Sequence, residues 1–157
     1  MKVKDILNNK WSLNTKFIIA RKLVACSNLM KREIVNWKRT GSIPDRKLSL
    51  QVNDVELITI SILDLVSIYG MDPLTAMLFF DDLIKANIND NKTQLINLIE
   101  RLQNGRHKKS LTMTPDMLEN IKSNQPELWN EYERLQKSTV ENIEAERVRI
   151  EEVEISE

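Results

Sequence analysis

The stretch KLVACSNLMKREIVNW, residues 22–37, predicts two short helices joined by a tight turn. We expect a first helix over residues 16–25 and a second over residues 29–39, with Gly41 ending the second. Asn28 is expected in the turn, since asparagine tolerates the left-handed conformation that ends a helix. Two helices at this spacing favour a helix-turn-helix, whose second helix packs its inner face on the first and presents polar side chains outward.

The side chains of the second helix divide into an inner and an outer set. Leu29, Ile34 and Trp37 are predicted to face the core, together with Leu23 and Val24 of the first helix. The others would point outward, where their chemistry suits the edges of base pairs: Met30, Lys31, Arg32, Glu33 and Asn36. Arginine and lysine donate to guanine, asparagine pairs with adenine, and a carboxylate accepts from cytosine. The helix over residues 30–39 is therefore predicted to read the major groove of double-stranded DNA.

The charge distribution points to the same part of the chain. The net charge is zero, but residues 1–47 hold 12 Lys and Arg against 3 Asp and Glu, and the remainder is correspondingly acidic. A basic end is typical of proteins that bind polyanions. We predict that DNA phosphates are contacted by five basic side chains of the two helices: Lys16, Arg21, Lys22, Lys38 and Arg39. The alternative is that the basic part pairs with the chain's own acidic part.

The segment VNWKRTGSIPDRKL, residues 35–48, resembles the end of the helix-turn-helix of CI-type phage repressors and Cro-like regulators. The opening VKDILNNKW, residues 3–11, resembles the first helix of that family, so that the likeness covers about residues 3–50. The family usually has Ala where Val24 stands and Gly where Asn28 stands. The resemblance implies a lambda-repressor-like domain and a sequence-specific phage or prophage repressor. Since helix-turn-helix proteins commonly bind two half-sites, a homodimer is expected.

The rest of the chain is also expected to be helical, which makes the predicted fold class all-α. After a helix over residues 3–11 and a short helix over residues 45–50, apolar spacing predicts further helices over residues 55–68, 74–84 and 91–102. A short helix after Pro115 and a long, charged helix from Pro126 to about Val153 follow. We divide the chain into a DNA-binding domain (1–52), a helical core or oligomerisation region (53–104), a linker (105–113) and charged C-terminal helices (114–157).

Several classes of function are disfavoured by the composition. Cys26 and His107 are single residues of their kinds, which leaves few candidates for acid–base or thiol catalysis and no zinc-binding pattern. There is no Gly-rich phosphate-binding loop. The longest apolar stretch is too short and too polar to span a bilayer. We therefore expect no enzyme activity, no cofactor, no metal and no membrane association, and the lone cysteine fits a cytoplasmic protein.

A second class of function remains open. The acidic remainder and the long Glu-rich C-terminal helix would suit a helical protein-interaction module, such as an antirepressor or a host-takeover factor that binds another protein. DNA binding through several basic side chains weakens steeply as the salt concentration rises, so that salt dependence separates the two hypotheses.

Overall fold

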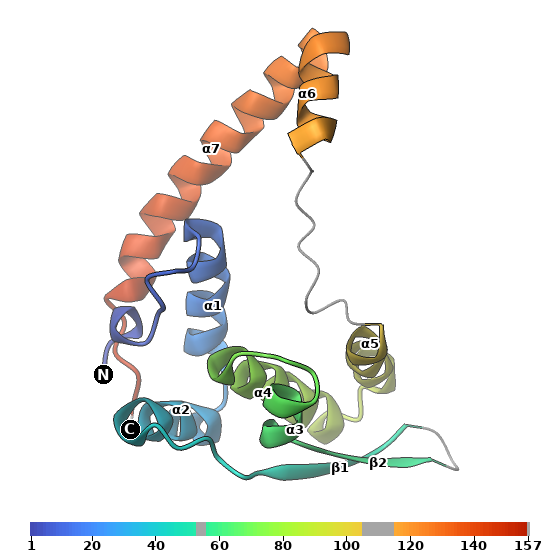
Figure 1. Ribbon diagram of the computed structural model, residues 1–157. Coiled ribbons are helices and arrows are strands. Elements are labelled where there is room, and N and C mark those ends of the chain that lie inside the picture. The colour runs from blue at the N-terminus through green and yellow to red at the C-terminus, as the bar shows by residue number, and fades with distance from the viewer. Residues whose placement is uncertain (53–55, 105–114, 157) are drawn as a thin grey trace.

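The computed structural model describes residues 1–52, 56–104 and 115–156, and it is mostly helical (Figure 1). The elements follow in the order η1 (Val3–Asp5), α1 (Leu13–Ala25), α2 (Asn28–Thr40), β1 (Lys47–Gln51), β2 (Leu57–Ser61), α3 (Ile62–Ser67), α4 (Pro73–Ile88), α5 (Lys92–Gln103), α6 (Pro115–Asn124) and α7 (Pro126–Glu151). The helices expected over residues 16–25, 29–39, 74–84 and 91–102 correspond to α1, α2, α4 and α5, and they are confirmed within a few residues at each end.

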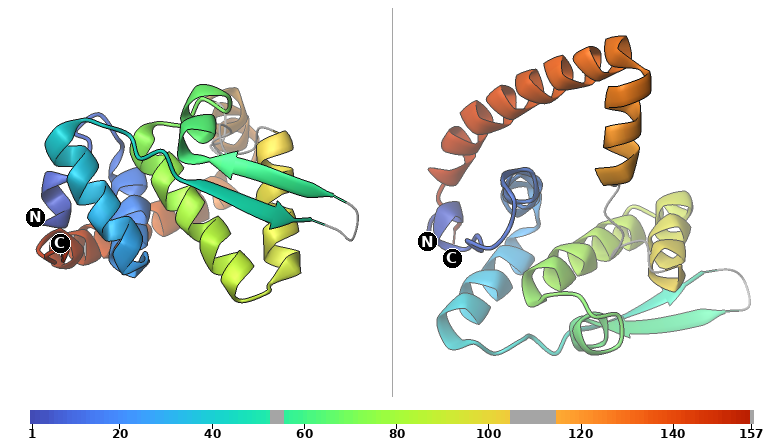
Figure 2. Two further views of the ribbon diagram at one scale, coloured as in Figure 1. Left: turned by 90° about the horizontal axis from the view of Figure 1, so that it is seen from below. Right: turned by 45° about the horizontal axis from the view of Figure 1, so that its top comes forward.

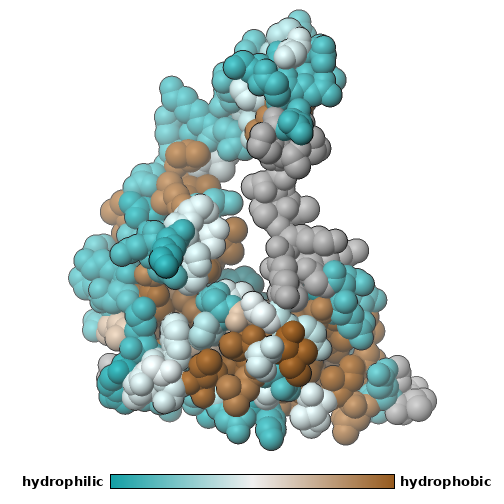
Figure 3. All heavy atoms as spheres, viewed as in Figure 1, coloured by the Kyte–Doolittle hydropathy of each residue, from teal (hydrophilic) through white to brown (hydrophobic). Residues whose placement is uncertain are grey.

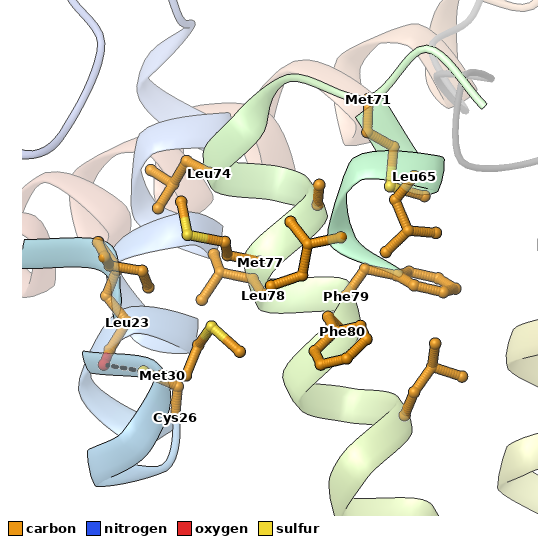
Figure 4. Close-up of a cluster of buried hydrophobic side chains, with 14 of the residues drawn as sticks. Leu23, Cys26, Met30, Leu65, Met71, Leu74, Met77, Leu78, Phe79 and Phe80 are labelled. Carbon is orange, nitrogen blue, oxygen red and sulfur yellow. Dashed lines mark hydrogen bonds between the residues drawn. The ribbon is translucent and has the colours of Figure 1, made fainter. Parts of the chain in front are cut away.

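Helix α4 is the centre of the molecule. It begins at a cap in which the Asp72 side chain accepts a hydrogen bond from Thr75 N at 3.2 Å, with Pro73 at the first helical position. Helices α1, α2, α3 and α5 all pack against it. Because neighbours surround α4, most of its side chains are buried, as the close-up in Figure 4 shows for Leu74, Met77, Leu78, Phe79 and Phe80.

The described chain is mostly helical, as predicted, but a two-stranded β-hairpin replaces one predicted helix and the first part of another. Strands β1 and β2 pair antiparallel, from Lys47 opposite Ser61 to Gln51 opposite Leu57. The expected helix over residues 45–50 is wrong, and the expected helix over residues 55–68 holds only for α3. The segment Leu57–Ser61 is rich in β-branched residues, which fit a pleated strand. Ser61 then caps α3 by accepting from Asp64 N at 3.0 Å.

The N-terminus is held by the C-terminal tail instead of forming the expected helix over residues 3–11. Only Val3–Asp5 is helical, as one 3-10 turn. The Asn8 side chain accepts from Lys10 N at 2.8 Å, a local bond that favours a turn over a helix. Val3 N donates to Val153 O at 3.1 Å, and Ile155 N donates to Met1 O at 2.8 Å. The two termini therefore lie side by side (Figures 1 and 2).

Helices α6 and α7 form a hairpin that projects from the rest of the molecule (Figures 1 and 2). The C-terminal part of α7 packs on α1 and η1, whereas its N-terminal part packs on α6. We call α6 together with residues 126–140 the arm, and residues 1–104 the body. The visible face of the arm is largely hydrophilic, and apolar side chains gather on the body (Figure 3).

The remaining expectations concern the division of the chain into domains and membrane-spanning helices. The predicted linker, residues 105–113, lies outside the described residues, and the predicted boundary after residue 52 falls between the two paired strands. None of the helices in the described ranges combines the length and the apolar character that a bilayer-spanning segment requires.

Candidate nucleic-acid interface

The junction between α1 and α2 is shorter than predicted. Cys26 and Ser27 are both extended, with φ of −70° and −62°, and α2 begins directly at Asn28. The Ser27 side chain caps α2 by accepting from Met30 N at 3.2 Å. Asn28 therefore does not adopt the left-handed conformation expected of it. The preference of serine for the N-cap position is the sequence signal that would have placed this start correctly.

A buried carboxylate fixes this junction to α4. The Asp81 side chain, 2% exposed, accepts from Ser27 Oγ at 2.6 Å and forms an ion pair with Lys85 Nζ at 3.1 Å. Ser27 N also donates to it, at 3.3 Å. Lys85 Nζ in turn donates to Ala25 O at 2.8 Å, which satisfies a carbonyl at the end of α1. We call Ser27, Asp81 and Lys85 the junction clamp, since together they join the end of α1, the start of α2 and the side of α4.

The inner face of α2 differs from the predicted one by one residue. Met30 is completely buried, although it was predicted to contact bases, and Figure 4 shows it packed towards α4. Leu29 and Val24, predicted to lie in the core, are 40% and 37% exposed. Ile34 is buried and Trp37 is half-buried against the core, as predicted. Met30 lies four and seven residues before Ile34 and Trp37 and therefore shares their face, whereas Leu29, five residues before Ile34, lies about 140° away around the helix.

The outer face of α2 carries a row of polar side chains. Asn28, Arg32, Asn36 and Arg39 follow one another at spacings of three and four, which places them on one side of the helix. All four are exposed, and Arg39 Nη2 donates to Asn36 Oδ1 at 2.9 Å. A shallow hollow of about 300 Å³ lies along this row, lined by Arg32, Glu33, Val35, Asn36 and Arg39. Guanidinium and amide groups in such a row can donate to base edges and phosphates.

Two of the predicted base-contacting residues lie at the margin of this row. The Glu33 carboxylate accepts from Arg46 Nη2 at 3.2 Å and from Arg46 Nε at 3.3 Å, so its charge is balanced within the chain. Lys31 is half-buried at the opposite margin of the row from Glu33. Of the five side chains predicted to contact bases, the structure therefore places only Arg32 and Asn36 on the open face. Asn28 and Arg46 were not predicted to belong to the site.

The five side chains predicted to contact phosphates lie in different surroundings. Arg39 and Lys38 lie at the exposed end of α2, where Lys38 Nζ is 5.7 Å from the centroid of the Trp37 ring. Lys22 pairs with Asp82 of α4 at 3.3 Å. Arg21 stacks over Phe17 and lines a hollow between α1 and α7, close to Glu146 and Arg149. Lys16 is half-buried near the start of α1.

Part of the basic charge is neutralised inside the chain. Lys2 and Lys4 pair with Glu152 of the C-terminal tail, at 3.3 and 3.9 Å, in addition to the pairs of Lys22 and Arg46. The alternative reading of the charge asymmetry thus holds for Lys2, Lys4 and Lys22, whereas Arg46 pairs with Glu33 inside the basic part itself. Across the part of the chain that the structure describes, Arg32, Lys38 and Arg39 form no ion pair with a carboxylate. Four basic side chains of α2 thus have no ion pair, and Lys10, Lys16, Arg21 and Lys47, outside α2, have none either among the described residues.

The remaining candidate chemistry is limited. Cys26 is buried beside the junction clamp, and burial, followed by the charge of Asp81, raises the pKa of its thiol to about 11. The thiol is therefore protonated and unreactive at neutral pH. No group of three His, Cys, Asp or Glu side chains able to hold a metal ion occurs within residues 1–52, 56–104 and 115–156. His107 lies outside the described residues.

Comparisons of the chain with protein-family models, with curated proteins and with solved structures give no match.

Proposed function

We propose that this protein is a sequence-specific DNA-binding regulator, acting as a repressor of the phage type, whose α2 enters the major groove. One observation carries the proposal. The exposed face of α2 presents Arg32, Asn36 and Arg39 without a free carboxylate, because Glu33 is held by Arg46. A helix whose outer face carries only groups of this kind suits the negatively charged groove of B-DNA, which is wide enough to admit it.

The side chains of α2 would have separate roles. Arg32 and Asn36 lie in the middle of the exposed face, and their bidentate groups suit guanine and adenine respectively. Lys38 and Arg39, at the end of the helix, would contact phosphates, which fix position and affinity but not sequence. In the same proposal Met30 supports the helix from inside, and Arg46 keeps Glu33 away from the phosphates.

The junction clamp contributes by making α2 rigid before DNA binds. A recognition helix that is already held in place loses less conformational freedom on binding, which raises affinity. Ser27 is shared between the start of α2 and Asp81, so the orientation of α2 is coupled directly to α4.

The test is a binding assay on duplexes selected by the wild-type protein from a random pool, with the region upstream of its own gene as a second probe. Arg32→Ala with Asn36→Ala should weaken binding to the selected site about 100-fold or more, since each base contact contributes about tenfold to a hundredfold. The matched control is Arg101→Ala with Asn97→Ala, which removes the same kinds of group, at the same spacing of four, from exposed positions of α5. Equal binding by the two double variants would overturn the proposal.

Salt dependence supplies an independent measurement on the same surface. Lys38→Ala should weaken binding to all duplexes alike, and it should reduce the slope of log affinity against log salt by about one. Its control is Lys2→Ala, because Lys2 already pairs with Glu152.

A helical protein-interaction module is the second candidate function. The internal pairing of Lys2, Lys4, Lys22 and Arg46 favours it, since these side chains leave less basic charge for DNA than the sequence suggests. Duplex binding that is absent, or that ignores salt, would favour this candidate over the first.

A further inference from the structure

The described side chains of the arm form no core of their own. Among the described side chains of α6 and α7, only Ile150 is buried, and it belongs to the part of α7 that packs on the body. Trp129 and Tyr132 stack on each other with ring centroids 5.7 Å apart and are half-buried, but Leu128 and Leu135 are 51% and 55% exposed. Two short helices that bury so little are marginally stable alone in water.

The two exposed leucines share one face of α7. They are seven residues apart, so they lie nearly above one another along the helix. The line continues, at spacings of eight and seven, to Ile143 and Ile150, and Ile150 is buried where α7 packs on α1. The apolar face that α1 covers in the lower part of α7 is thus uncovered in the arm.

The charges beside the leucines are opposite in sign. Glu127 directly precedes Leu128, and Arg134 directly precedes Leu135. When two copies of such a helix run antiparallel with Leu128 of each against Leu135 of the other, Glu127 of each copy comes beside Arg134 of the other. A two-fold axis repeats every contact, so the leucine contact and the ion pair each form twice. In a parallel pairing, residues seven apart lie on opposite sides of the seam from their copies, so this ion pair would not form.

We infer that the arm is the surface through which two copies of this chain associate, antiparallel, with Leu128 against Leu135 and Glu127 beside Arg134. Arg134 now pairs with Glu131 of its own helix, and both side chains are exposed enough to form new contacts. The arm projects from the body at the end of the molecule away from α2 (Figure 1). Association there leaves the outer face of α2 open, and it stands whether or not the protein binds DNA.

The first test measures the mass of the full chain in solution without DNA. Light scattering across a concentration series should give twice the chain mass of 18.3 kDa for the wild type. Leu128→Asn with Leu135→Asn should weaken the dimer about tenfold or more, since both leucine contacts of the dimer are lost. Val148→Asn is the matched control, because Val148 is 55% exposed on the opposite face of α7. A monomeric wild type, or a leucine variant as dimeric as the control, would overturn the inference.

The second test asks whether a second copy of the chain binds the arm and whether the two copies run antiparallel. Glu127→Arg and Arg134→Glu should each weaken self-association, because each places like charges opposite one another. An equimolar mixture of the two variants should associate again, since every such pair then joins opposite charges. A mixture no more dimeric than its components would exclude the antiparallel register. Circular dichroism of each variant separates lost association from lost helix.

Discussion

The body and the arm are both helical and rich in charge, yet they use their side chains differently. In the body each of α1 to α5 buries several apolar residues, and even a carboxylate, Asp81, is enclosed and fully engaged. In the arm the aromatic side chains are half-buried, and Leu128 and Leu135 are exposed. The body therefore fixes the position of α2 through contacts within one chain, whereas the arm offers surface for contacts between chains.

The largest expected effect lies in the junction clamp of the body. Asp81→Ala removes the acceptor of Ser27 and the partner of Lys85, and it should lower the free energy of unfolding by about 3 kcal/mol, measured by urea denaturation. Asp82→Ala is the control, since its half-exposed pair with Lys22 should contribute less than about 1 kcal/mol. Equal losses for the two variants would mean that the clamp does not hold α2.

A somewhat smaller effect tests which residue faces the core at the start of α2. Met30→Ala should lower the free energy of unfolding by about 2 kcal/mol or more, because it leaves a cavity against α4. Leu29→Ala should cost less than about 0.5 kcal/mol, since Leu29 is already 40% exposed. The opposite order would restore the register that the sequence first suggested.

Much of the body was predictable because its signals are local. Asp72 and Pro73 mark the start of α4, Asn91 marks the start of α5, and Gly41, with φ of 76°, ends α2. The hairpin was missed because Leu57–Ser61 runs directly into α3. A continuous apolar run of this length fits a buried helix as well as a strand, and only pairing with β1 decides between them.

The candidate site was harder to predict than the helices that carry it. The faces of α2 follow from helical spacing, and the prediction placed Leu29 in the core although Met30 is the residue that shares a face with Ile34 and Trp37. The pairing of Glu33 with Arg46 and of Lys22 with Asp82 could not be predicted either, since the two members of each pair are far apart in the sequence. From the sequence alone, Asp81 and Asp82 are expected to be two solvated carboxylates. Asp81 is buried only because α4 packs against the junction.

The buried thiol provides a pH-dependent comparison within the body. Since the pKa of Cys26 is raised to about 11 in the folded state, from 9.0, the unfolded chain loses this proton first as the pH rises. The contribution of the thiol to stability is therefore constant below pH 9 and declines between about 9 and 11. Cys26→Ala should remove this part of the alkaline decline, as measured by urea denaturation at several pH values. An unchanged decline would place the thiol in a less buried environment.

The smallest effect is expected in the arm. A substitution there tests whether the arm and the body unfold independently of one another. Trp129→Ala removes a ring that stacks on Tyr132 and lies under Lys122, 5.8 Å from its Nζ, but this ring is only half-buried. It should change the free energy of unfolding of the body by less than about 0.5 kcal/mol, followed through the fluorescence of Trp11 and Trp37 at a concentration where the chain is monomeric. Trp37→Ala, in the body, should cost several times more, because Trp37 packs against the core. Similar losses for the two tryptophans would mean that α7 transmits the state of the arm to α1, and the arm would then be part of one cooperative unit with the body.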